Sequence, residues 1–188
     1  MILCDHQIRK AIFEGHLIIK PTPDPSQIQS TAIDLRVGDD FKRWNRALSA
    51  RGFGAKIDLD DVDLSQLLPL MEPLEPVNGI VAIEPGDFVL VRTLEDVCLP
   101  LKNKLAARVE GRSKQARLGM GVHITAPTIH AGFSGRITLE IVNHGPFTLQ
   151  ARPNQSKLCQ LIIERVGGIP DRNVGHFSNQ STPLGTPT

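Results

Sequence analysis

Polar and apolar residues alternate along several short segments in the second half of the chain. In residues 135–143, the side chains of Ile137, Leu139 and Ile141 fall on one face of an extended chain, and Glu140 falls on the other. A period of two residues is typical of a strand with one buried face. Further strands are predicted at residues 31–41, on both sides of a turn at 84–87, and at 104–109, 121–126, 147–151 and 157–165.

Only one segment has the spacing of a clear amphipathic helix. Ile8, Ala11 and Ile12 fall on one helical face, Asp5 is placed to cap the start, and Gly15 ends the pattern. Many short strands with a single helix favour an all-β barrel or jelly-roll over alternating strands and helices. We therefore predict a mainly β fold with a short N-terminal helix.

The chain of 188 residues is predicted to form one domain over residues 1–166. Within it, residues 42–78 contain the only tryptophan, an acidic run and several prolines, and we expect a surface excursion there. The tail, residues 167–188, is polar and rich in Gly and Pro, so it cannot bury enough apolar surface to fold alone. We expect it to be flexible, or to be ordered by a ligand or a neighbouring subunit.

The charge, the cysteine content and the apolar segments of the chain argue against several classes of function. The formal net charge of +1 gives no overall basic surface, which argues against a nucleic-acid polymer as the main partner. Cys4, Cys98 and Cys159 are far apart and predict neither a disulfide framework nor a structural zinc site. The N-terminus has no apolar leader and the chain has no long apolar run, so we expect a cytoplasmic protein without a membrane segment.

A basic segment follows the strand predicted at 104–109. Ser113 is placed to cap a short helix that Gly119 ends, and Arg117 shares a face with Ser113 because the two are four residues apart. Together with Arg112 and Lys114, a helix start of this kind predicts an anion site that suits phosphate. An ordinary basic turn between strands is the alternative interpretation.

Glu140 lies on the polar face of its predicted strand and has two interpretations. It is either a half-solvated strand residue, or a carboxylate that lines a cavity beside an arginine and acts as a general base. His123, His130 and His144 are isolated in sequence, which gives metal ligation little support. The chain also lacks the H-x-E and P-C-x-x-C signature, so the zinc route to nucleobase deamination is excluded.

The motifs of the chain, taken together and in order, resemble those of the dCTP deaminase family within the trimeric dUTPase-like superfamily. They are ILCDHQIRKAIFEG at 2–15, STAIDLRVG at 30–38, EPGDFVLV at 84–91, EGRSKQARLGMGVHITAPTIHAGFSGRITLEIVN at 110–143, RPNQSKLCQLIIE at 152–164 and FSNQ at 177–180. The resemblance implies a distorted β-barrel of the dUTPase-like type. It also implies homotrimers with active sites between subunits, and a C-terminal tail that closes over the nucleotide.

The implied activity is hydrolytic deamination of dCTP to dUTP and ammonia, without zinc, in the synthesis of pyrimidine deoxynucleotides. Glu140 matches the catalytic glutamate, Ser113 and the carbonyl of Ala126 match the groups that hold the attacking water, and Arg117 matches the arginine that pairs with the glutamate. Mg²⁺ is expected on the triphosphate rather than in a protein site. dTTP is a candidate feedback inhibitor. Positions that match nucleotide or phosphate contacts are Arg112, Ser113, Lys114, Thr128, His130, Gln160, His176, Phe177 and Gln180.

Some positions depart from the family pattern. His130 stands where an aspartate is usual, Lys114 where a serine is usual, and His176 and Phe177 where lysine and tyrosine are usual. Because histidine cannot reproduce a carboxylate acceptor when protonated, His130 argues against a bifunctional enzyme that releases dUMP and pyrophosphate. Three alternatives stay open: that bifunctional enzyme, a shifted cytosine-nucleotide substrate, and a non-catalytic nucleotide-binding regulator on the same scaffold.

Overall fold

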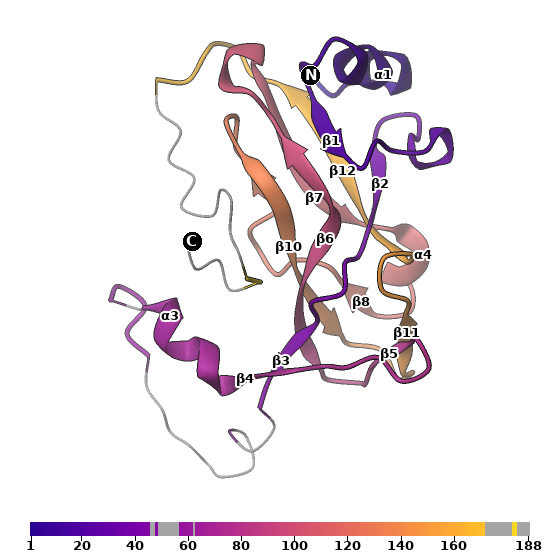
Figure 1. Ribbon diagram of the computed structural model, residues 1–188, viewed down its shortest axis with the longest axis vertical. Helices are drawn as coiled ribbons and strands as arrows, with labels where there is room; N and C mark the ends of the chain where they lie inside the picture. The colour runs from indigo at the N-terminus through magenta and orange to yellow at the C-terminus, as the bar shows by residue number, and fades with distance from the viewer. Residues whose placement is uncertain (46–47, 49–56, 62, 172–181, 184–188) are drawn as a thin grey trace.

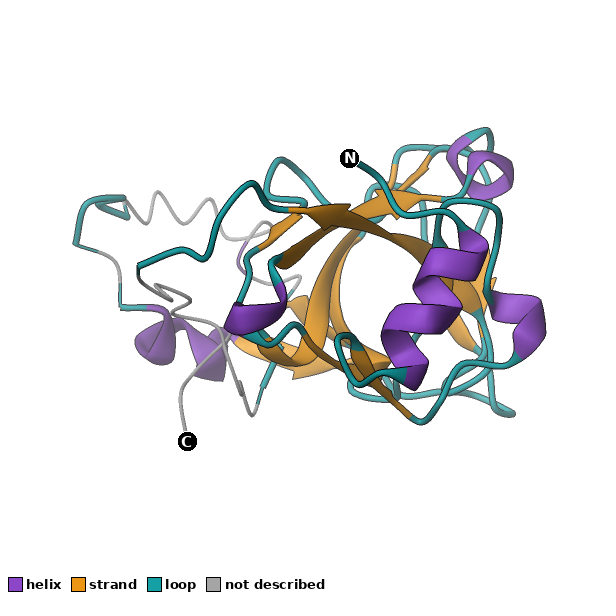
Figure 2. Cartoon of the chain, turned by 90° about the horizontal axis from the view of Figure 1, so that it is seen from above, coloured by secondary structure: helices purple, strands orange, loops and turns teal. Residues whose placement is uncertain are grey.

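The computed structural model describes residues 1–45, 48, 57–61, 63–171 and 182–183, and these form a mainly β barrel with a helix at one end (Figure 1). One sheet has the strand order β4-β3-β6-β10-β8, with β1 also paired to β6; a second has the order β2-β12-β7-β9; and β11 pairs with β5. Seen from above, the strands curve around a common interior (Figure 2). The predicted fold class is confirmed.

The strands are short except for those that form the walls of the barrel. They are β1 (Ile18–Lys20), β2 (Ile33–Arg36), β3 (Lys42–Trp44), β4 (Met71–Pro73), β5 (Val81–Ile83), β6 (Phe88–Cys98), β7 (Leu105–Gly111), β8 (Met120–Gly121), β9 (Thr128–Ile129), β10 (Ser134–Asn143), β11 (Leu149–Ala151) and β12 (Lys157–Arg165). The helices are α1 (Asp5–Phe13), α3 (Leu64–Leu67) and α4 (Ser113–Ala116), with single 3-10 turns η1 (Pro25–Gln27), η2 (Leu68–Leu70) and η3 (Leu101–Asn103).

The apolar faces of the long strands meet in one interior. Val91 of β6 and Leu139 of β10 are at most 1% exposed, and burying an aliphatic side chain of this size contributes roughly 1.5–3 kcal/mol. The alternation predicted for β10 is confirmed, because Ile137 and Ile141 are also buried while Glu140 is partly exposed.

Several predicted element boundaries are wrong; the strand predicted at 31–41, for example, is β2, which spans only Ile33–Arg36. The strand expected at 121–126 ends at Gly121, because the following residues bond to Glu140 of β10 and not to a strand ladder. At the start of α1 the cap is Cys4 and Asp5 is the first helical residue. The Cys4 N–H donates to Gln7 Oε1 at 3.1 Å, so the first free amide is satisfied from within the helix.

Residues 42–78 are partly built into the barrel. β3 pairs with β6 and β4 pairs with β3, so both ends of this segment belong to the larger sheet. Trp44 and Phe88 pack against a small buried cluster of Met71 and Leu90. The segment therefore extends the sheet at its edge before and after its excursion.

The tail beyond Asp171 is largely outside the described residues. His176, Phe177 and Gln180 fall there, so their roles and the closing of the tail over the site stay predictions. Among the residues that the structure does describe, we find no helix with the length and apolar character that a membrane crossing needs.

Cys159 of β12 lies fully inside the barrel. Burial raises the pKa of its thiol far above the ordinary value of 9.0; the negative charges of Glu95 and Asp34 add to the increase, and Arg112 opposes it. The folded protein therefore keeps this thiol protonated at pH values where the unfolded chain loses the proton.

Because only the unfolded chain loses this proton near pH 9, the Cys159 thiol does not change the free energy of unfolding below pH 9. Above pH 9 it lowers the free energy of unfolding as the pH rises. We expect the free energy of unfolding of the wild type to fall by up to about 1.4 kcal/mol per pH unit more steeply than that of Cys159→Ala. Urea denaturation from pH 8 to about pH 10.5 measures both slopes. The substitution also removes core contacts, so slopes are compared rather than absolute values; equal slopes would contradict the prediction.

Candidate active site

Glu140 holds a loop against its own strand. Its backbone N–H donates to the Val122 carbonyl at 3.0 Å, and its Oε2 accepts a hydrogen bond from the Ile124 N–H at 2.8 Å. Among the described residues, Oε1 has no hydrogen-bond partner. The carboxylate is thus held in one orientation with one oxygen available. Its partial exposure differs from the buried carboxylate beside an arginine that the sequence suggested.

The loop held by Glu140 leads directly into other predicted site residues. Ala126 is exposed, and no backbone N–H of the described chain donates to its carbonyl. Thr128 of β9 is exposed and pairs with Arg108 of β7, and His130 is exposed just beyond β9. Ala126, Thr128 and His130 therefore follow one another along a surface segment that begins at the Glu140 contact.

The basic segment forms a single helical turn, α4. Ser113 is its first helical residue and not its cap, because the chain leaves β7 with Arg112 still extended at φ −89° and ψ 131°. Ser113, Lys114 and Arg117 are all exposed, as a site for a charged ligand requires. Four residues make a weak helix dipole, so the side-chain cations carry most of the attraction for an anion.

Two glycines fix α4 relative to the end of β10. Gly119 follows the helix with φ +90°, and a Cβ at that position would collide with the backbone of Gly145. The Gly119 carbonyl accepts a hydrogen bond from the His144 N–H at 2.8 Å. From the sequence, Gly119 was predicted only to end the helix, and its close approach to Gly145 was not predicted.

Arg117 and Glu140 are not paired within one chain. Arg117 is exposed and forms no ion pair with any residue in the described ranges, and the partner of Glu140 is Ile124. The pairing implied by the resemblance is therefore absent from the single chain.

Arg112 and Gln160 both contact Asp34, which was not among the predicted site residues. Arg112 Nη2 lies 3.3 Å from Asp34 Oδ2, and Gln160 Nε2 donates to Asp34 Oδ1 at 3.0 Å. Arg112 Nη1 also donates to the Lys157 carbonyl at 3.0 Å. A carboxylate between Ile33 and Leu35 in the STAIDLRVG motif was the only signal for this contact.

A cavity of about 510 Å³ lies beside α4. Of the predicted site residues that the structure describes, its wall includes only Arg112; Glu140, Ala126 and His130 are not in it. The other lining residues are Gln115, Leu118, Met120, Phe147, Thr148, Leu149, Gln150, Ser156, Lys157 and Leu158. The carboxylate chemistry and this cavity therefore occupy different places in the single chain.

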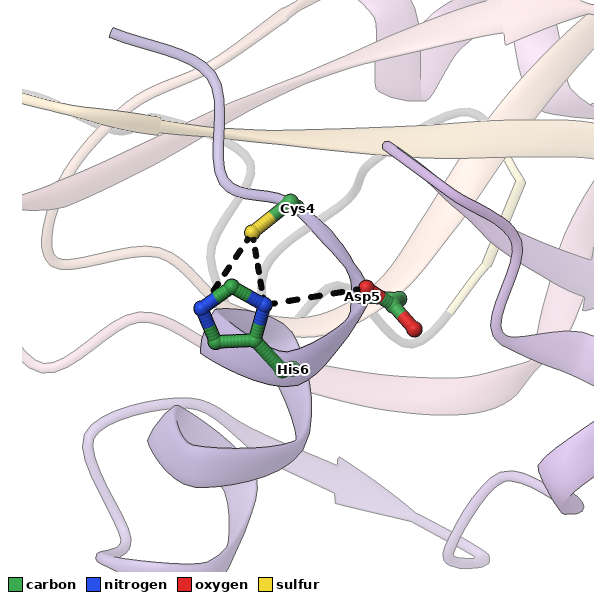
Figure 3. A group of neighbouring side chains, drawn as sticks. All are labelled: Cys4, Asp5 and His6. Carbon is green, nitrogen blue, oxygen red and sulfur yellow. Dashed lines mark hydrogen bonds and ion pairs between the residues drawn. The ribbon is translucent and has the colours of Figure 1, made fainter.

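Cys4, Asp5 and His6, at the start of α1, bring three metal-ligating atoms within 4.8 Å of one another (Figure 3). Cys4 Sγ lies 3.1 Å from His6 Nδ1, and Asp5 Oδ1 lies 3.8 Å from the same nitrogen. The side chains of His6 and Asp5 are 79% and 51% exposed, whereas structural zinc sites are closed shells of about four ligands. This cluster does not meet that requirement and includes no residue predicted for nucleotide chemistry.

Comparison with known proteins gives a consistent assignment. Residues 2–166 match a family described as dCTP deaminase-like. The dUMP-forming dCTP deaminase of Methanothermobacter thermautotrophicus is 40% identical over 185 residues, covering 98% of this chain and 89% of that protein. The dCTP deaminase of a Marinomonas species is 36% identical over 178 residues, covering 92% and 87%.

A solved structure shares the fold. The crystal structure of 2′-deoxycytidine 5′-triphosphate deaminase from Agrobacterium tumefaciens has a TM-score of 0.63 and 24% identity, and covers 88% of this chain. The match spans 48%, about half, of that longer chain. The fold is thus the β-barrel of that solved structure. More particularly, the chain belongs to the dCTP deaminase-like family, a family of hydrolytic enzymes.

Proposed function

We propose that the protein deaminates dCTP by hydrolysis, with Glu140 as the general base and acid. The observation that carries this proposal is the Glu140 carboxylate, held by the Ile124 N–H at 2.8 Å with its other oxygen unpaired among the described residues. A positioned carboxylate with a free oxygen suits proton transfer to and from a bound water. Relatives named dCTP deaminase, 36–40% identical to this chain, support dCTP as the substrate.

The proposed reaction converts dCTP and water to dUTP and ammonia. Glu140 takes a proton from the water as its oxygen attacks C4 of the cytosine ring. Protons then pass to N3 and to the amino group, which leaves as ammonia. The Ala126 carbonyl and the Ser113 hydroxyl are proposed to hold the water. The direct connection of the Ala126 loop to Glu140 supports the first of these roles.

The triphosphate is proposed to bind at the turn of Arg112, Ser113 and Lys114. Two cations and a hydroxyl at an exposed turn support this assignment. Mg²⁺ is proposed to enter with the triphosphate as part of the substrate. Thr128 and His130, on the segment beyond Ala126, are proposed to lie beside the sugar.

The active site is proposed to form between copies of the chain, in a homotrimer. Within the described part of one chain, Arg117 is exposed and forms no ion pair, and one oxygen of Glu140 has no hydrogen-bond partner. Each half of the implied arginine–glutamate pair is therefore proposed to be available to a neighbour. The number of copies, three, is inferred from the family resemblance.

A second candidate is a bifunctional enzyme that releases dUMP. The relative from Methanothermobacter thermautotrophicus, and those from Methanosphaera stadtmanae and Methanobrevibacter smithii at 37% identity, are named dUMP-forming. These names favour the bifunctional reaction, whereas His130 in place of the usual aspartate argues against it.

The role of Glu140 can be tested by the substitution Glu140→Gln. The amide cannot accept the proton of the water, so ammonia release from dCTP should fall by about 100-fold or more. Glu164→Gln, a partly exposed carboxylate paired with Arg108 on the other sheet, is the matched control and should keep its activity. Full turnover in Glu140→Gln, measured as ammonia and separated nucleotide products, would refute the mechanism.

The identity of the product separates the two candidates. If the enzyme only deaminates, ammonia should accumulate with dUTP and without pyrophosphate when dCTP is supplied with Mg²⁺. Pyrophosphate and dUMP in amounts equal to the ammonia would instead establish the bifunctional reaction and show that His130 does not prevent it. Quantifying ammonia and pyrophosphate in one time course distinguishes these outcomes.

The shared site predicts complementation between two inactive variants. Glu140→Gln and Arg117→Ala should each be inactive alone, but mixed oligomers should regain activity because some sites combine the two intact halves. Co-expression with two different affinity tags isolates such oligomers. If they form at wild-type size and stay inactive, the two residues do not act across an interface.

A further inference from the structure

Asp34 is a carboxylate enclosed by the protein, with side chains from distant parts of the sequence around it. It is 1% exposed in the middle of β2. Its Oδ1 accepts from Gln160 Nε2 at 3.0 Å, and its Oδ2 accepts from Gln29 Nε2 at 3.3 Å. The guanidinium of Arg112 lies against Oδ2, also at 3.3 Å. A buried carboxylate needs such partners, because desolvation of an unpaired charge is costly.

A second buried carboxylate lies beside this group but has different partners. Glu95 is 0% exposed and accepts two hydrogen bonds from Arg36, one from the backbone N–H and one from Nε, both at 2.8 Å. Gln27 Nε2 connects the two, donating to Glu95 Oε1 at 3.1 Å and to the Asp34 backbone carbonyl at 2.8 Å. Glu95 therefore shares the environment of Asp34 and makes no contact with Arg112 or Gln160.

We propose that Asp34 is a positioning residue of the nucleotide site, which orients the guanidinium of Arg112 and the amide of Gln160 toward the phosphates of the substrate. The inference rests on the proposed function, which assigns Arg112 to the triphosphate, and on the family resemblance, which matches Gln160 to a nucleotide contact. Asp34 acts through both of them without touching the ligand.

Two contacts fix the orientation of the planar guanidinium of Arg112. One terminal nitrogen points at Asp34 Oδ2 and the other donates to the Lys157 carbonyl, so the guanidinium is held at two points. The side chain is 33% exposed, which leaves its remaining N–H groups accessible to a ligand at the adjacent Ser113 turn. Such preorganisation lowers the ordering cost of bidentate phosphate binding.

The contact to Gln160 fixes which end of the amide faces outward. Asp34 and Gln160 are cross-strand partners on β2 and β12. An ionised carboxylate can only accept hydrogen bonds, so the amide nitrogen must face Asp34 and the carbonyl oxygen must face away. Gln160 is partly exposed, and its orientation toward a ligand is therefore determined by Asp34.

If Asp34 acted only through its negative charge, neutralising it would have the opposite effect on phosphate binding. A negative charge 3.3 Å from Arg112 weakens the attraction of that arginine for phosphate, so neutralising Asp34 would tighten phosphate binding. Positioning predicts weaker binding, because Arg112 and Gln160 lose their orientation. The sign of the change distinguishes the two.

The test compares Asp34→Asn with Glu95→Gln, each of which neutralises a buried carboxylate. Calorimetry with inorganic tripolyphosphate gives the dissociation constant for the phosphate part alone, steady-state assays with dCTP give KM and kcat, and thermal unfolding gives stability. We expect Asp34→Asn to raise both the dissociation constant and KM about tenfold or more, with a smaller change in kcat. Glu95→Gln should lose thermal stability but keep both constants within about twofold.

A double variant and ¹⁵N spectra of the arginine side chains provide two further tests. In the background of Arg112→Ala, neutralising Asp34 should add much less to KM than it does alone, because the two residues act as a unit. If Asp34→Asn does not fold, ¹⁵N spectra of the wild-type guanidinium groups replace it: Arg112 should show restricted rotation, and free rotation would overturn the proposal. Unchanged or tighter tripolyphosphate binding in a folded Asp34→Asn protein, or an equal loss in Glu95→Gln, would also overturn it.

Failure of the proposed function gives a different result. If the wild type binds tripolyphosphate but does not deaminate dCTP, the function is wrong and the positioning role is decided by the dissociation constants alone. If the wild type binds neither ligand, both proposals fall.

Discussion

The antiparallel pairing of β6 with β10 is the constraint on which the barrel depends. The pairing runs from Ser134 opposite Cys98 to Val142 opposite Phe88, with a register shift between Arg136 and Thr138. The other strands of the larger sheet attach to this pair, β1 and β3 to β6, β8 to β10, and β4 through β3. A slip of one residue would turn the buried face of β10 outward and bring its glutamate into the core, so the hydrophobic alternation also determines where the carboxylate lies.

Strand alternation could be predicted because it depends on residues two positions apart. The pattern of β10 therefore located both its buried face and Glu140 correctly. The helix start of α1 was misplaced by one residue: Cys4 is the cap, and Gln7 Oε1 accepts a hydrogen bond from its N–H. Local preference favours aspartate as a cap and does not register a glutamine side chain that bonds back to the residue before the helix.

The contacts that sequence reasoning missed join residues far apart in the chain. Gln160 is separated from Asp34 by 126 positions, and the contact of Gly119 with Gly145 requires two turns to meet in space. Neither pair has a periodic signature. The family resemblance supplied Arg112 and Gln160 as individual residues, and only the fold shows that they share one buried carboxylate. The pairing of Arg117 with Glu140 that the resemblance implies is not made within a single chain, and between copies of the chain it stays a prediction.

The outermost strands of the larger sheet have a consequence for how the protein behaves at high concentration. β4 spans only Met71–Pro73, and β8 only Met120–Gly121. Short edges, one of them containing a proline that cannot donate to a ladder, are poor templates for a foreign strand. Edge-to-edge aggregation is therefore disfavoured at these two borders. Association between copies of the barrel at these borders therefore depends on contacts between side chains rather than on added strand pairing.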